Sequence, residues 1–63
     1  MNNSEENFLL DTKQAAAYLN ISPSTLETWR VRKTCIIPYL KLGKSVRYRK
    51  QDLDSYIESM VVN

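Results

Sequence analysis

The sequence is poor in the residues on which most enzymes and metal sites depend. It has no histidine, one cysteine and one glycine among its 63 residues. A single cysteine excludes an internal disulfide, and no spacing of cysteine or carboxylate residues matches a zinc or calcium site. A single glycine excludes a glycine-rich phosphate loop. We therefore expect no enzymatic activity, no metal or other cofactor, and no small-molecule substrate.

Long apolar runs are also missing. No stretch is long enough to span a membrane, and no basic-then-apolar leader opens the chain. We therefore expect a cytoplasmic protein with no membrane partner. A chain of this length forms one small domain, because folding buries only roughly 60% of its surface. Residues 1–7 are polar and without periodicity, which predicts a flexible N-terminal tail before a folded domain over residues 8–63.

Charge is distributed unevenly along the chain. Residues 30–50 contain eight lysines and arginines and no acid. By contrast, residues 1–29 carry one lysine against four acids, and residues 51–63 carry three acids and no base. Eight cations within so short a stretch repel one another unless they are spread apart in space or neutralised. The pattern therefore favours a polyanionic partner, and nucleic acid above all.

Two short helices joined by a tight turn are predicted in the first half of the chain. Asp11 and Gln14 have the spacing of a capping box, which predicts a helix over residues 12–19. Ser22 can cap a second helix over residues 23–33, whose first residue is a proline. The pair has the form of a helix-turn-helix, although a plain helical hairpin uses the same pieces.

The second of these helices has one apolar and one hydroxyl-rich face. Leu26 and Trp29 share the apolar side at helical spacing, and we expect Trp29 to be mostly buried against the first and third helices. A helix with hydroxyls and an arginine on its outer side can enter the major groove and bond to phosphates and base edges. A solvated helix face is the alternative. The outer side chains are Ser24, Thr25, Thr28 and Arg32.

Residues 39–49 change from a helical period to a period of two, which predicts a hairpin that turns at the only glycine. We expect a three-residue turn over residues 43–45, because it places all four apolar strand side chains on one buried face. In that register Lys41 and Arg47 oppose each other on the open face, a repulsion that a negatively charged partner would relieve. The four apolar residues are Leu40, Leu42, Val46 and Tyr48.

A third helix is predicted from about Arg49 to Met60. Arg49 and Lys50 lie at its start, the end of the helix dipole that disfavours cations, so a bound phosphate would stabilise them there. Two surface cations at a helix start are also commonplace. The inner stripe at helical spacing consists of Leu53, Tyr56, Ile57 and Met60.

Taken in order, these segments resemble the small helix-turn-helix domains of the excisionase and AlpA type, which are related to the MerR-like winged helix. The resemblance covers about residues 9–57. It departs from the family where glycine is often found, at Asn20 and in residues 33–35. The segments that carry it are Leu9-Leu10, Ala15-Ala16-x-Tyr18-Leu19, Ile21-Ser22-x-Ser24-Thr25-Leu26, Trp29-Arg30, Lys41-Leu42-Gly43-Lys44, Val46-Arg47-Tyr48 and Asp52-Leu53-x-x-Tyr56-Ile57.

The resemblance implies an α+β, mainly helical winged helix-turn-helix, with three helices and a two-stranded hairpin wing between helices 2 and 3. It also implies sequence-specific binding of double-stranded DNA, with helix 2 in the major groove and the wing along the backbone. The expected DNA-binding residues are Ser22, Ser24, Thr25, Thr28, Arg30, Arg32, Lys33, Lys41, Lys44, Arg47, Arg49 and Lys50.

Within that family we expect an excisionase, a recombination directionality factor of a mobile genetic element that bends DNA for site-specific recombination. Its partners would be an integrase or further copies of itself on DNA, and it would be associated with the nucleoid. A small AlpA-like transcription regulator is the alternative. A protein-interaction module on the same fold is a further one.

Overall fold

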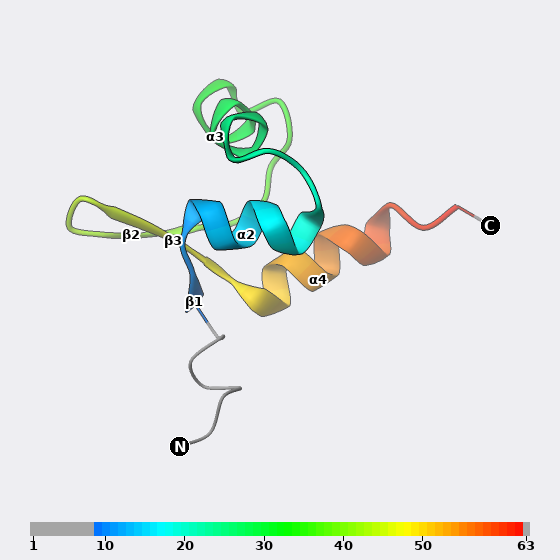
Figure 1. The fold of residues 1–63 in the computed structure, drawn as a ribbon. Coiled ribbons are helices and arrows are strands. Elements are labelled where there is room, and N and C mark those ends of the chain that lie inside the picture. Colours follow the sequence, from blue (N-terminus) through cyan, green and yellow to red (C-terminus); the bar gives the residue numbers. More distant parts are fainter. Residues whose placement is uncertain (1–8, 63) are drawn as a thin grey trace, which may run out of the picture.

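The computed structural model describes residues 9–62, which form three α-helices and a three-stranded antiparallel sheet (Figure 1). This is the predicted α+β, mainly helical class, with the hairpin between the second and third helices of a winged helix-turn-helix. The tail expected over residues 1–7 lies outside the described residues. The elements are β1 (Leu9–Leu10), α2 (Thr12–Leu19), α3 (Pro23–Arg32), β2 (Leu40–Leu42), β3 (Ser45–Arg49) and α4 (Lys50–Ser59).

Helix α2 lies at the centre, with α3 on one side and α4 on the other, while the β2–β3 hairpin projects away from the helices (Figure 1). Its start is fixed by the predicted capping box. The Asp11 carboxylate accepts from the Gln14 N–H at 2.7 Å, and the Gln14 side chain accepts from the Asp11 N–H at 3.0 Å. Helix α3 begins under Ser22, whose hydroxyl accepts from the Thr25 N–H at 3.1 Å. Within residues 9–62 no helix has the length and apolar character needed to cross a membrane.

The first two helices each end in a residue with left-handed backbone. Asn20 has φ 61° and Lys33 has φ 58°. Glycine is the usual residue in this conformation, because it lacks a Cβ. These are the positions at which the chain departs from the glycines of the family it resembles. At both positions this chain adopts the conformation that glycine favours with a residue other than glycine.

The core lies where the three helices meet the sheet. The small side chains of Ala15 and Ala16 on α2 are fully buried and let α3 approach closely. Trp29 packs against this core from its rim and stays partly exposed, with its ring 6.0 Å from that of Tyr56 on α4. The buried core residues are Leu10, Ala15, Ala16, Leu26, Ile37, Tyr48 and Leu53.

The hairpin register differs from the prediction. Strands β2 and β3 pair Lys41 with Val46 and Leu42 with Ser45, which leaves Gly43 and Lys44 as a two-residue turn. The predicted three-residue turn is wrong, and so is the opposition of Lys41 and Arg47, because Leu40 is the residue that faces Arg47.

The physical reason lies in the turn and in the reach of the core. Gly43 adopts φ +65°, and positive φ is what two-residue hairpin turns require to match the twist of their strands. In the observed register only Val46 and Tyr48 face the core. The hairpin extends beyond the helices, so a four-residue apolar face would have had nothing to cover it. Leu42 is accordingly 53% exposed.

Strand β1 was not predicted. Leu9 pairs with Arg49 and Leu10 with Tyr48, which gives the sheet order β1-β3-β2. Leu10 is buried beside Tyr48. A strand of two residues is too short to produce a period of two in the sequence.

Helix α4 forms as predicted, but only its first half packs on the core. Leu53 is fully buried and Tyr56 partly buried, whereas Ile57 and Met60 are exposed. The predicted inner stripe is therefore wrong for its last two residues. The reason is length: the end of α4 and the C-terminal residues run past the eight-residue α2 and project from the domain (Figure 1).

Candidate nucleic-acid interface

The outer face of α3 is polar and accessible. Ser24, Thr28 and Arg32 are exposed there, as predicted. Together with Glu27 and Val31 they line a shallow hollow on the helix surface. Glu27 and Val31 are not among the predicted DNA-binding residues. A helical projection places both beside Thr28, so their position could have been found from spacing alone.

The first turn of α3 is occupied by its own cap. The hydroxyls of Ser22 and Thr25 lie 2.8 Å apart, and the Ser22 hydroxyl also accepts from the Thr25 N–H. Thr25 is consequently half-buried, while Ser22 is exposed. Both remain near the helix start, where backbone N–H groups favour an anion.

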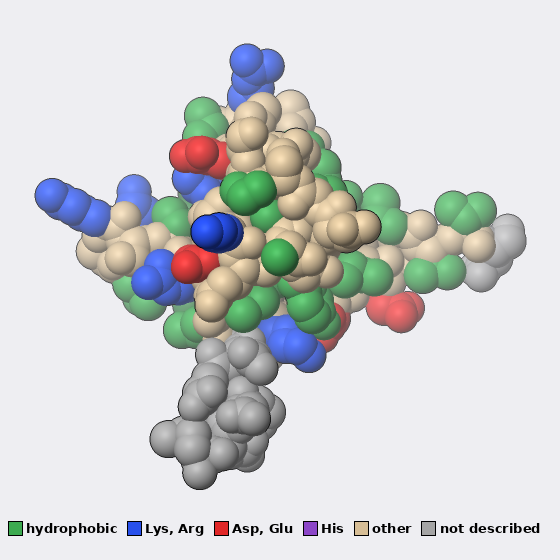
Figure 2. All heavy atoms as spheres, viewed as in Figure 1, with side chains coloured by type: hydrophobic (Ala, Val, Ile, Leu, Met, Phe, Trp, Pro, Cys, Tyr) green, Lys and Arg blue, Asp and Glu red, His purple; other side chains and the backbone are tan. Residues whose placement is uncertain are grey.

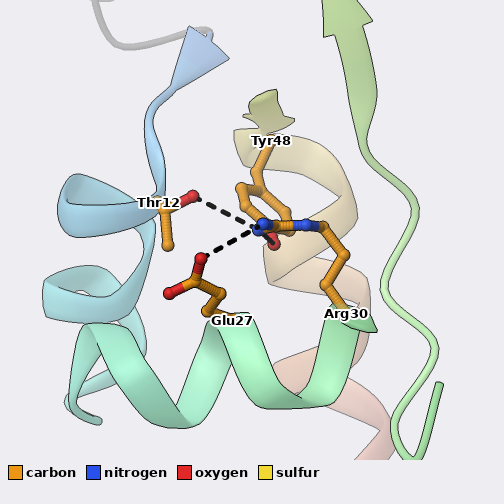
Figure 3. Close-up of polar contacts among 4 residues, drawn as sticks. All are labelled: Thr12, Glu27, Arg30 and Tyr48. Atoms are coloured by element: carbon orange, nitrogen blue, oxygen red, sulfur yellow. Dashed lines mark hydrogen bonds and ion pairs between the residues drawn. The ribbon is translucent and has the colours of Figure 1, made fainter. Parts of the chain in front are cut away.

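Arg30 is engaged within the protein. Its side chain is only 17% exposed, and Nη1 donates to the Tyr48 hydroxyl at 3.3 Å and to Thr12 Oγ1 at 3.5 Å (Figure 3). Nη2 lies 3.8 Å from Glu27, and the guanidinium lies 5.8 Å from the centre of the Tyr39 ring. Arg30 therefore joins α3 to α2 and β3, although the sequence placed it among the DNA contacts.

Two further cations of the basic block have acidic partners on α4. Arg49 binds Asp52 through two contacts, with Nε 2.7 Å and Nη2 3.2 Å from the carboxylate oxygens. Lys50 lies 3.8 Å from Asp54, whose carboxylate also accepts from the Tyr18 hydroxyl. These aspartates offset the unfavourable position of two cations at a helix start, so a bound phosphate is not required there.

The other five cations of the block form no ion pair with any residue of 9–62. They occupy two places, the C-terminal end of α3 and the hairpin. Figure 2 shows Lys and Arg side chains projecting at the left, where the hairpin lies, and at the top, over α3. The basic block thus divides into three neutralised and five unneutralised cations, the latter being Arg32, Lys33, Lys41, Lys44 and Arg47.

The hairpin register separates its cations by face. Directly opposed residues point to the same side of a sheet, so Lys41 shares the side of Val46, which is turned toward the helices. Arg47 shares the other side with Leu40, and its Nη1 donates to the Val46 carbonyl at 2.8 Å. Lys44 lies in the turn at the tip. Lys41 and Lys44 are therefore the hairpin cations available on the side of α3.

The contact between α3 and α4 is made by two aromatic side chains, Trp29 and Tyr56. Interaction with the Cys35 side chain, together with burial, raises the pKa of Tyr56 above its ordinary value of 10.0. The Tyr56 ring packs against Trp29, with the ring centres 6.0 Å apart. Across residues 9–62 the acids and the cysteine form no cluster of three that could hold a metal ion.

The comparison with known families agrees with this geometry. A family model described as a helix-turn-helix domain matches residues 9–61, almost the whole described chain. No curated protein matches the sequence.

Proposed function

The chain belongs to this helix-turn-helix family of small DNA-binding domains, of the excisionase and AlpA-like type, and on that premise we propose how it holds DNA. Helix α3 enters the major groove of a specific duplex site, and the β2–β3 hairpin lies on the adjacent phosphate backbone. The observation that carries the proposal is the division of the basic block, which leaves free cations on these two elements.

The two groups of cations suit the two walls of one groove. Arg32 and Lys33 lie at the end of α3, and Lys41 and Lys44 lie on the hairpin. The major groove is about 12 Å wide and admits a helix, so a helix lying in it has a phosphate strand on either side. Lysine and arginine contacts to phosphates fix the position of a protein on DNA, while base edges supply the sequence preference.

The salt dependence of binding tests this proposal. Each phosphate contact contributes about −0.9 to the slope of log affinity against log salt. The four cations on these two walls therefore give a slope of about −3.6 for the parent on duplex DNA. A variant with these four cations replaced by glutamine should show a slope near zero while keeping its fold by circular dichroism. A parent that fails to bind duplex DNA would instead favour a protein-interaction module.

We further propose that the protein acts as an excisionase in site-specific recombination, in the company of an integrase or of further copies on DNA, and at the nucleoid. Contacts that are mostly to phosphates, on both sides of a groove, suit a protein that shapes DNA. Fluorescence energy transfer between the labelled ends of a bound duplex measures bending. Straight DNA in the complex would favour the alternative, an AlpA-like transcription regulator.

A further inference from the structure

The two edges of α3 face different parts of the molecule. Arg30 donates to Tyr48 on β3 (Figure 3) and lies over the ring of Tyr39, so the edge of α3 that carries Arg30 faces the hairpin. Glu27 is beside Arg30 on that edge. Val31 is four residues after Glu27 and therefore lies next to it on the same side of the helix.

The opposite edge of α3 faces α4. Trp29 packs there against Tyr56. Thr25 and Arg32 are four and three residues from Trp29, so they lie on the same edge. A duplex held by both α3 and the hairpin meets the edge nearer the hairpin. Glu27 and Val31 consequently approach the base edges more closely than Thr25 and Arg32 do.

We infer that Glu27 and Val31 determine the sequence preference of the protein. Glu27 accepts a hydrogen bond from the exocyclic amino group of a cytosine, and Val31 contacts the methyl group of a thymine, both in the major groove. This inference rests on the proposed function, in which α3 lies in that groove.

Glu27 and Val31 are not required for the stability of the fold, because both side chains are exposed. The Glu27 side chain is 63% exposed and Val31 is 69% exposed. Valine has a lower helix propensity than most residues and gains nothing from folding when it is left in water. On a surface that meets a polyanion, a carboxylate lowers affinity for any sequence and is compensated only where it finds a donor.

The Glu27 carboxylate has one cationic neighbour among residues 9–62. Arg30 lies 3.8 Å away and is itself fixed by the hydroxyls of Tyr48 and Thr12. The guanidinium offsets part of the negative charge and leaves carboxylate oxygen lone pairs free, because an ionised carboxylate has about four acceptor sites. Arg30 therefore draws the exposed Glu27 carboxylate toward its own side of α3.

Spacing along the helix sets the spacing of the two bases. Residues four apart are separated by about 6 Å along a helix axis. One base step rises about 3.4 Å along a strand. The cytosine and the thymine should therefore lie within about two base steps of each other.

The experiment is selection of binding sites from a randomised duplex library by the full chain. It is repeated with Glu27→Gln, Val31→Ala and the control Glu58→Gln, which removes the same charge from the exposed end of α4. Glutamine pairs with adenine, so Glu27→Gln should change one selected position from cytosine to adenine, with roughly tenfold altered preference. Val31→Ala should lose the thymine nearby, and uracil in place of that thymine should weaken the parent but not Val31→Ala.

The controls keep the inference separate from the proposed function. Glu58→Gln should select the parental site, because it changes only net charge. A thermal melt of each variant establishes that it folds. Folded Glu27 and Val31 variants that select the parental site would overturn the inference and leave the groove-binding proposal standing. A parent that selects no duplex at all would overturn the proposed function itself.

Discussion

Lys33 ends α3 in a left-handed backbone conformation, with φ 58°, that lysine adopts only at a cost. Such a residue costs roughly 1–3 kcal/mol, and glycine adopts the same conformation without a clash. Lys33→Gly should therefore stabilise the domain by roughly 1 kcal/mol, which corresponds to a rise of about 4–8 °C in Tm. The same change should flatten the salt dependence of DNA binding by about 0.9. Differential scanning calorimetry and a salt titration measure the two effects.

Asn20 provides the matched control for Lys33. It has nearly the same backbone geometry, with φ 61°, but asparagine tolerates that conformation. Asn20→Gly should therefore raise Tm by less than Lys33→Gly and leave the salt dependence alone. An equal gain from both substitutions would mean that the strain at Lys33 is not specific to lysine.

Arg30 gives the sharpest contrast between a structural and a DNA-binding cation. Arg30→Met keeps the length and apolar stem but leaves the buried Tyr48 hydroxyl without its donor partner. Unfolding free energy should fall by roughly 1–3 kcal/mol, as for a buried polar group that loses its partner. Urea denaturation measures this loss. The salt slope of DNA binding should be unchanged, and a flatter slope with intact stability would show that Arg30 contacts phosphate after all.

At the scale of the elements, the register of the β2–β3 hairpin determines which of its cations should affect the salt dependence of DNA binding. Lys41 and Lys44 lie on the side of α3 and at the tip, so the double variant Lys41→Gln, Lys44→Gln should flatten the salt slope by about 1.8. Arg47→Gln should change it less, because Arg47 lies on the other face and already donates to the Val46 carbonyl. Fluorescence anisotropy at several salt concentrations compares the two. A larger effect from Arg47→Gln would place the opposite face of the hairpin on the DNA.

The elements also show how far a sequence of this length can be interpreted. The caps at Asp11 and Ser22 are local signals between residues three apart, so both helix starts were predicted correctly. The hairpin register depends on where the core ends, which no local pattern contains, and Leu42 was therefore assigned to the wrong side. Strand β1 forms through the pairing of Leu10 with Tyr48, which is distant in the sequence, so no local pattern predicts it.

The candidate DNA interface also has a part that the sequence predicts and a part that depends on the fold. The basic block in residues 30–50 correctly pointed to a DNA-binding family, because charge composition needs no geometry. Which cations are free could not be predicted, since the partners of Arg49 and Lys50 depend on the path of α4. The contact proposed for Glu27 is not indicated by charge composition, because a carboxylate repels the phosphates of DNA.

At the scale of the whole molecule, the net charge of +2 is the sum of positive and negative charges that lie in different parts of the protein. Five unneutralised cations lie at the end of α3 and on the hairpin, while on α4 Glu58 is the acid that has no cation partner among residues 9–62. The hairpin and α4 extend in different directions from the centre (Figure 1). A molecule with its charges separated in this way is turned as it approaches a polyanion, so that encounters begin with the basic side.

Strand β2 is a free edge of the sheet, because the strand order is β1-β3-β2. Free edges can pair with the edge of another copy, and proteins oppose this with short strands, lysines and nearby prolines. Here β2 has three residues, with Lys41 in its middle and Pro38 just before it. The lysine proposed to hold a phosphate therefore also opposes aggregation through strand pairing in the free protein. When Lys41 binds a phosphate, its charge no longer protects the edge of β2. The bound duplex then covers that edge in its place.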